Sequence, residues 1–179
     1  GLIAGMATAA RALRPGFEII GVQTQRFPAM VNAIKGTHLP QGSSTIAEGI
    51  AVGAPGALTE AIIRERVDDL LLVDEGDIEQ AVLMLLEIEK TVVEGAGAAG
   101  LAALLRHGER FHGRRVGLVL CGGNIDPLLL AGLIQRGMVR AGRLTRLRVA
   151  ARDVPGALAR ITATVAEAGA NIDEVHHQR

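Results

Sequence analysis

The sequence has no tryptophan and no tyrosine, and aromatic residues make up only 2% of it. Proteins that stack bases on aromatic side chains need such residues, so this composition argues against binding of single-stranded nucleic acid. The chain also lacks an excess of positive charge, because 19 basic residues balance 19 acidic ones. Since nucleic-acid binding rewards basic patches, we expect no nucleic-acid partner.

Cysteine and lysine are equally scarce. A single cysteine, Cys121, excludes a disulfide framework and a cluster of metal-binding thiolates. Only two of the 19 basic residues are lysines, Lys35 and Lys90. No apolar run approaches the roughly 20 residues that a membrane span requires, and no basic segment precedes an apolar stretch as in a signal peptide. We therefore expect a cytoplasmic protein that has no membrane partner.

Both ends of the chain have an unusual form for a complete protein. The sequence begins without methionine, directly in a helix predicted over residues 2–14. It stops at Arg179, just after a strand predicted over residues 171–175. We expect a fragment that is cut inside one domain and again inside a second domain; the alternative is a native protein whose initial methionine has been removed.

The pattern of apolar residues predicts an α/β fold. Three short and nearly continuous apolar segments are typical of buried strands, at residues 17–22, 70–73 and 116–120. Helical periodicity or capping residues between and after them predict helices at residues 58–66, from Asp74 onward, 92–106 and 126–136. This alternation predicts three αβα layers around a parallel sheet, with ligand sites at the carboxyl ends of the strands.

The composition changes near Arg143. Residues 144–149 alternate between apolar and polar side chains, which predicts a half-buried strand. A turn at Asp153–Gly156 then leads into a helix predicted over residues 157–168. We expect a first domain over residues 1–142 and a truncated βαβ module over residues 143–179.

Four segments contain residues that could bind a ligand. Gly1 and Leu2 begin a helix whose amides suit a phosphate, although a glycine there is more often only a cap. Leu120–Asp126 follows a predicted strand, and it is equally typical of a ligand loop and of a buried cysteine before a glycine turn. Thr45–Ile50 alone is more typical of a surface loop. Glu94 is either a partly buried acid with a partner or a helix cap.

Other ligand classes have little support. No Gly-x-Gly-x-x-Gly motif follows a predicted strand, so dinucleotide binding is poorly supported. The five histidines show no spacing with carboxylates that is typical of a metal site, so we expect no metal.

Five segments, taken together and in this order, resemble the threonine dehydratases: GLIAGMA, TIAEGIAV, VDDLLLVDEGDIEQA, VVEGAGAAGLAALL and LCGGNID. These are pyridoxal-phosphate enzymes of the tryptophan-synthase-β-like fold, close to serine racemases, and the resemblance covers residues 1–142. The tail RLRVAARDVPGALARITATVAEAGANID resembles the opening of an ACT domain. The resemblance implies part of a fold-type II catalytic domain, followed by the start of an ACT-like regulatory domain.

The resemblance also implies pyridoxal 5'-phosphate as cofactor and assigns residues to it. Gly1 matches the last glycine of the run that holds the cofactor phosphate, and Leu2 follows it. Cys121 matches the Ser or Cys that the family places near the pyridine nitrogen. Gly49 and Glu94 match positions that line the cofactor ring in relatives.

Two further groups of the family have no counterpart in this chain. Neither Lys35 nor Lys90 has the motif that surrounds the family's Schiff-base lysine, so we expect that lysine upstream of Gly1. Some relatives bind a divalent cation through a Glu and an Asp, and Gln23 and Ala29 stand at those places. A hard cation lacks its oxygen ligands there, so the resemblance implies no metal site.

The implied activity is deamination of L-threonine to 2-oxobutanoate and ammonia by α,β-elimination, with some activity on L-serine. We expect this chain alone to be inactive and the full-length protein to be a homo-oligomer. An amino-acid effector is expected at the turn Asp153–Gly156, unless that turn only caps the next helix. The alternatives are a serine racemase or serine dehydratase, and a non-catalytic amino-acid-binding regulatory protein.

Overall fold

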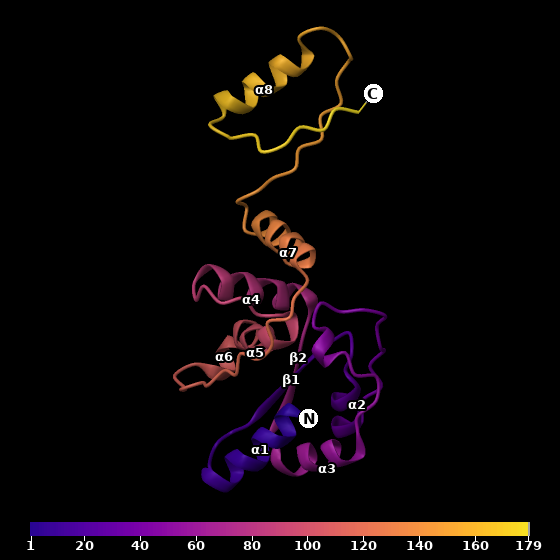
Figure 1. Cartoon of the computed structure of the whole chain (residues 1–179), viewed down its shortest axis with the longest axis vertical. Coiled ribbons are helices and arrows are strands. Elements are labelled where there is room, and N and C mark those ends of the chain that lie inside the picture. Colours follow the sequence, from indigo (N-terminus) through magenta and orange to yellow (C-terminus); the bar gives the residue numbers. More distant parts are fainter. Residues whose placement is uncertain (179) are drawn as a thin grey trace. The chain divides into compact units, whose positions relative to one another are not determined.

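The computed structural model describes residues 1–178 and divides into two compact units, Gly1–Leu144 and Thr145–Arg179 (Figure 1). The predicted domain boundary after residue 142 stays a prediction about the whole protein. Within residues 1–178, the helices are all too short or too polar to cross a membrane.

A pair of parallel strands forms the centre of the first unit. β1 (Ile20–Thr24) pairs with β2 (Asp69–Val73), with Ile20 opposite Asp69 and Thr24 opposite Val73 (Figure 1). The predicted strand at residues 70–73 is confirmed, and the one predicted at 17–22 begins three residues and ends two residues further along the chain. Parallel strands end at the same edge, so Thr24 and Val73 bring the segments that follow them together.

Helices surround this pair of strands. The predicted helices are confirmed with small shifts of their bounds, and α2 and α6 were not predicted. In chain order the helical elements of the first unit are α1 (Leu2–Leu13), α2 (Ala29–Lys35), the 3-10 turn η1 (Glu48–Ile50), α3 (Ala57–Arg66), α4 (Glu75–Glu87), α5 (Gly95–Arg106), α6 (Gly108–Phe111) and α7 (Pro127–Arg140).

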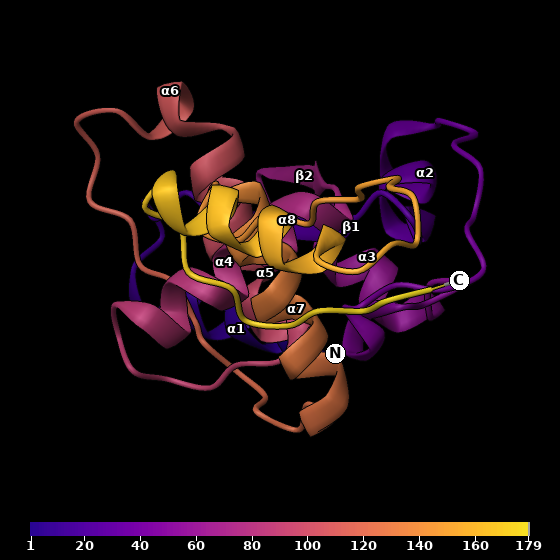
Figure 2. The same ribbon diagram turned by 90° about the horizontal axis from the view of Figure 1, so that it is seen from above.

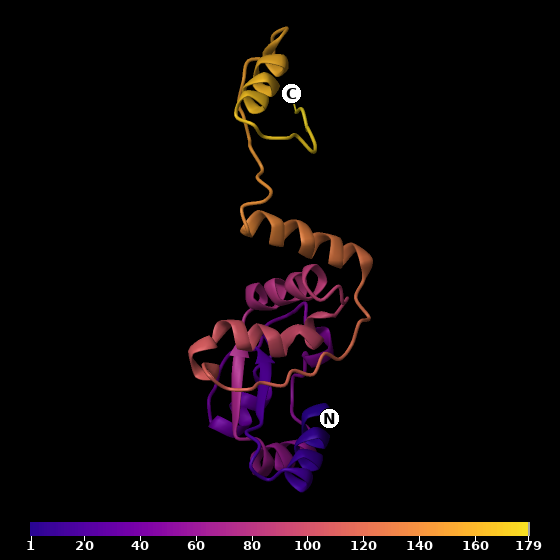
Figure 3. The same cartoon turned by 90° about the vertical axis from the view of Figure 1, so that its left-hand side faces the viewer.

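Alternate side chains of β2 enter two different apolar cores. Leu70 and Leu72 pack with α1, α2 and α3 on one face, whereas Leu71 and Val73 pack with α4, α5 and α7 on the other. Successive side chains of a strand point to opposite faces, so a strand that is apolar at every position needs both faces covered. Figure 3 shows α4 between α5 and α7 on the second face. The αβα prediction is therefore confirmed.

The start of α4 has the capping residues that the sequence indicates. Asp74 accepts a hydrogen bond from the Asp77 amide, and the Asp77 carboxylate accepts one from the Asp74 amide, each 2.9 Å long. The hydrogen bond from the Asp77 amide, with further contacts from Arg106, lowers the pKa of Asp74 although burial raises it. The carboxylate of Asp74 is thus committed to capping this helix.

Three strand predictions are wrong for the described residues. Residues 116–120 form no ladder, and their large apolar side chains are 36–50% exposed. The segments 144–149 and 171–175 are also irregular. An apolar pattern makes a segment suitable for a strand, but the strand forms only when its amides and carbonyls meet a neighbouring strand. Within residues 1–178, only β1 and β2 meet in this way.

The second unit contains one helix, α8 (Ala157–Glu167), among its described residues. Figure 2 shows α8 between two irregular segments. Gly156 precedes the helix with a φ of +84°, a conformation that glycine adopts without steric cost. The predicted helix at residues 157–168 is confirmed, whereas the predicted effector site at this turn stays a prediction.

Asp69 should make the protein sensitive to acid. Burial raises the pKa of this carboxyl group, but hydrogen bonds from Lys35 and Arg110 outweigh it and lower the pKa from 3.8 to about 2. A lowered pKa contributes stability above pH 4 that disappears as the pH falls from about 4 to about 2. We expect Asp69→Asn to be less stable than wild type at pH 5 and to lose less stability between pH 4 and 2.

The measurement is the free energy of unfolding by urea across this pH range. Glu65→Gln is the control, because the Glu65 side chain is 71% exposed, and it should keep the wild-type slope. An equally steep fall in Asp69→Asn would show that other carboxylates cause the acid sensitivity.

Candidate functional site

The segment Thr45–Ile50 packs closely against the start of α5. A Cβ atom on Gly95 would lie 2.3 Å from the Ile46 carbonyl oxygen. The two backbones are therefore so close that only glycine fits at residue 95. Ala47 is fully buried in the apolar core. The segment is therefore more than a surface loop: Ile46, Ala47 and Ile50 pack in the apolar core, whereas Glu48 and Gly49 are exposed.

Glu94 lies between this loop and the segment that follows residue 120. It occupies the N-cap position of α5, but its carboxylate makes no capping hydrogen bond. Its backbone amide donates to the Gly122 carbonyl oxygen at 3.1 Å. A Cβ atom would lie 3.2 Å from the Glu94 Oε1 atom if built on Gly49 and 2.3 Å if built on Gly122. The carboxylate of Glu94 thus lies between two glycines that are far apart in sequence.

Cys121 packs against the first turn of α5. A Cβ atom on Gly97 would lie only 2.1 Å from the Cys121 carbonyl oxygen. Gly122 has a φ of +85°, which lets the chain turn beneath Glu94. Cys121 is half-buried, so it is accessible to a bound group. Gly49, Glu94 and Cys121 are therefore brought to one place, as the resemblance implies.

A cavity of about 70 Å³ lies beside this cluster. It is lined by Ile46, Glu48, Glu94, Asn124, Ile125, Asp126 and Leu129. Asp126 itself caps α7, since its carboxylate accepts hydrogen bonds from the amides of Leu128 and Leu129. The polar lining thus comes from the same loops that carry Gly49, Glu94 and Cys121.

Gly1 and Leu2 begin α1, which packs against α3. Both residues are exposed, and a Cβ atom on Gly1 would have no atom within 4 Å. No side chain caps this end of the helix, so the amides of its first turn are open to an anion. The contacts that gather Gly49, Glu94 and Cys121 do not include these two residues.

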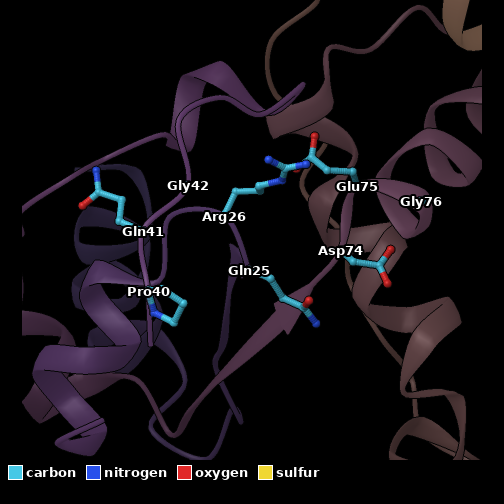
Figure 4. A pocket seen from close by; sticks show the side chains of 8 residues that line it. All are labelled: Gln25, Arg26, Pro40, Gln41, Gly42, Asp74, Glu75 and Gly76. Atoms are coloured by element: carbon cyan, nitrogen blue, oxygen red, sulfur yellow. The ribbon is translucent and has the colours of Figure 1, made fainter. Parts of the chain in front are cut away.

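A larger cavity of about 480 Å³ lies at the carboxyl ends of β1 and β2. It is lined by Gln25, Arg26, Pro40, Gln41, Gly42, Asp74, Glu75 and Gly76 (Figure 4). The Arg26 side chain points toward Glu75, whereas the Asp74 carboxylate points away from both (Figure 4). The sequence pattern assigned no ligand-binding role to these residues, although their position after two parallel strands is a recognisable signal.

Both lysines are held in structural contacts. The Lys35 Nζ atom donates to Asp69 Oδ1 at 2.7 Å and to the Leu70 carbonyl oxygen at 2.8 Å. The Lys90 Nζ atom donates to the Glu87 carbonyl oxygen at 2.5 Å. Neither amino group belongs to the cluster around Glu94 and Cys121.

Gln23 helps to fix the start of α2. Its Oε1 atom accepts a hydrogen bond from the Val31 amide at 2.8 Å, and Ala29 is the first residue of that helix. Gln23 thus serves the backbone of a neighbouring helix.

Comparison with known proteins extends this description. A profile of the family described as "Pyridoxal-phosphate dependent enzyme" matches residues 1–122, and a profile of the ACT domain matches residues 145–179. An L-threonine ammonia-lyase of Geobacter sulfurreducens is 46% identical over 182 residues, and one of Thermotoga maritima is 40% identical over 181 residues. Both matches cover 100% of this chain but only 45% of the relative, so the chain spans less than half the length of these relatives.

Solved structures give the same result. A crystal structure of a T.th. threonine deaminase matches with a TM-score of 0.63 and 38% identity, over 70% of this chain and 46% of that chain. Maize serine racemase matches with a TM-score of 0.64 and 31% identity, over 78% of this chain and 44% of that chain. With the profile match over most of its length, the chain belongs to the family of pyridoxal-phosphate dependent enzymes.

Proposed function

We propose that the protein containing this chain is an L-threonine ammonia-lyase. It would convert L-threonine to 2-oxobutanoate and ammonia by α,β-elimination, with some activity on L-serine. The observation that carries the proposal is the cluster in which Gly49 and Gly122 approach the Glu94 carboxylate next to Cys121. The names of the Geobacter and Thermotoga relatives support the same activity.

The residues of the cluster fit one end of the cofactor. Glycine at residues 49 and 122 keeps the backbone bare at the point where a Cβ atom would approach Glu94, and a flat ring needs such a surface for close contact. At the other end, the open first-turn amides after Gly1 suit a phosphate group. We therefore assign Gly1 and Leu2 to the phosphate, and Gly49, Glu94 and Cys121 to the ring.

Pyridoxal phosphate supplies an electron sink for bonds at the substrate α-carbon when it is bound. Cys121 would set the strength of that sink. A thiol forms only a weak hydrogen bond with the ring nitrogen and does not stabilise a positive charge on that nitrogen. A weaker sink favours prompt loss of the β-hydroxyl group, which is elimination, over racemisation or transamination. Glu94 and Gly49 would hold the ring in place.

The chain does not contribute the lysine that such chemistry requires. The amino groups of Lys35 and Lys90 are bound to Asp69 and to backbone carbonyls away from the cluster. We therefore propose that residues 1–179 alone are inactive, and that the active protein is a cytoplasmic homo-oligomer. The ACT-like part, residues 143–179, would bind an amino-acid effector.

The direct test is turnover by the full-length protein. Formation of 2-oxobutanoate and ammonia from L-threonine supports the proposal. Formation of D-serine from L-serine as the main activity would instead assign the protein to the serine racemases, which the similarity to the maize enzyme makes the second candidate. Titration with isoleucine and valine in the same assay tests the effector, and flat curves would contradict regulation.

Cys121 variants of the full-length protein should separate elimination from other reactions. Cys121→Ser should keep most of the activity, because a hydroxyl group still faces the ring nitrogen without charge. Cys121→Asp should protonate that nitrogen and raise racemisation or transamination at the expense of elimination. The measurements are 2-oxobutanoate formation and the absorbance spectrum of the cofactor. Normal elimination and an unchanged spectrum in Cys121→Asp would show that residue 121 is not at the ring nitrogen.

A further inference from the structure

The Glu75 carboxylate joins three separate parts of the first unit. Its Oε1 atom accepts hydrogen bonds from the Thr45 hydroxyl at 2.6 Å and from the Thr24 hydroxyl at 3.1 Å. Its Oε2 atom accepts a hydrogen bond from the Ile46 amide at 2.8 Å. These donors lie at the end of β1 and in the loop before η1, whereas Glu75 is the first residue of α4.

Glu75 is not needed to cap α4. Asp74 already accepts the hydrogen bond from the Asp77 amide, and the Asp77 carboxylate completes the capping box. The Glu75 side chain instead turns into the wall of the 480 Å³ cavity (Figure 4). Its contacts therefore point to a role in the loop that it holds.

The shortest contacts of the two threonine hydroxyl groups are with Glu75. The Thr45 hydroxyl lies 2.6 Å from Glu75 Oε1 but 3.5 Å from the Thr24 hydroxyl oxygen. A hydroxyl group has one proton to donate. The Thr24 oxygen also accepts from the Arg26 amide at 3.2 Å, and the Thr45 oxygen accepts from the Ala47 amide at 3.1 Å. Both hydroxyl protons are thus directed to Glu75, and Thr24 is fully buried, so water cannot replace this acceptor.

The loop that Glu75 holds is the one that carries Gly49. The Ile46 carbonyl packs on Gly95, and Gly49 packs on Ala96 and the Glu94 carboxylate. A shift at Thr45 and Ile46 therefore moves the backbone at Gly49 relative to Glu94. We propose that Glu75 is a positioning residue, which fixes the Thr45–Ile50 loop so that Gly49 and Glu94 present one surface to the cofactor ring. This inference rests on the proposed function, because it takes that surface to be the ring site.

Replacement of Glu75 by glutamine should break this arrangement although the two side chains have the same shape. A carboxylate offers acceptors on both sides, whereas an amide offers one acceptor and one donor group. In either orientation, the NH₂ group of glutamine would face at least one of the three donors. The loss of one hydrogen bond to a charged group lowers the equilibrium constant for holding the loop in place by about tenfold.

The experiment uses the full-length protein and two measurements on the same variants. Hydrogen exchange of the cofactor-free protein reports whether residues 45–50 are held, and titration with pyridoxal phosphate gives its dissociation constant. For Glu75→Gln we expect faster exchange in residues 45–50, unchanged exchange in α1 and α3, and a dissociation constant raised about tenfold. Thr45→Val should change both in the same direction, and Thr45→Ser should restore wild-type values because it keeps the hydroxyl group.

Glu87→Gln is the matched control, since it removes a carboxylate from the same helix, where Glu87 pairs with Arg143. It should leave both measurements unchanged. Wild-type exchange of residues 45–50 in Glu75→Gln would overturn the anchoring role. Faster exchange with a wild-type dissociation constant would overturn the link to the cofactor. A wild-type protein that fails to bind pyridoxal phosphate would overturn the proposed function and this link, while the exchange data would still decide the anchoring.

Discussion

Gly97→Ala should lower the free energy of unfolding by about 1–3 kcal/mol and weaken cofactor binding. The added Cβ atom would lie 2.1 Å from the Cys121 carbonyl oxygen and 2.5 Å from the Val93 Cγ1 atom. The first of these atoms belongs to the backbone, so a rotamer change cannot relieve the contact. The chain at Cys121 must move away from α5, and the Cys121 side chain, which we propose to face the ring nitrogen, moves with it.

Gly100→Ala provides the matched control for this prediction. It makes the same change one turn later in α5, where the Cβ atom would meet only Leu118 Cδ2 at 3.5 Å. Alanine favours the helical conformation over glycine by about 0.5–1 kcal/mol, so this variant should be as stable as wild type or more stable. Urea unfolding and the dissociation constant of pyridoxal phosphate measure both effects. Equal stability of the two variants would contradict the close approach at Gly97.

Leu133→Ala should lower the free energy of unfolding by about 2–5 kcal/mol. The Leu133 side chain is only 1% exposed and joins the core that contains α4, α5 and β2. Its helix already packs tightly, because a Cβ atom on Gly137 would lie 2.5 Å from the Leu83 Cδ2 atom. A close helix contact cannot collapse further to fill the lost volume, so we expect a cavity and a cost in the upper part of this range.

Leu128→Ala is the control for this variant, because Leu128 lies in the same helix but is 84% exposed. Its effect should stay within about 0.5 kcal/mol. Thermal and urea unfolding of the two variants give the comparison. A small effect of Leu133→Ala would mean that α7 contributes little to the stability of the first unit.

The ion pairs of α7 contribute less to the stability of the first unit than the burial of Leu133. Arg136 and Arg140 pair with the buried Glu79 carboxylate at 2.7 and 3.1 Å, but both arginine side chains are about half exposed. Solvent weakens such pairs. Burial of Leu133 is therefore the larger contribution, and the pairs with Glu79 fix how α7 lies on α4.

The sequence alone determined the local features of this protein. Asp74 and Asp77 predict the capping box of α4, because the four residues that form it are consecutive in the chain. The apolar residues of β2 predict a strand with both faces covered for the same reason. The motifs around Gly49, Glu94 and Cys121 also indicated residues that meet in space, although only through resemblance to a family.

The tertiary structure decided everything that depends on a partner distant in sequence. Residues 116–120 have the apolar pattern of a strand but no strand beside them among residues 1–178. Glu94 stands at a helix cap position, yet its carboxylate faces glycines from two other loops. Glu75 gave no signal in the sequence, because its partners Thr24 and Thr45 lie 51 and 30 residues away. A hydrogen bond or a ladder needs two groups at one place, and a local pattern specifies only one of them.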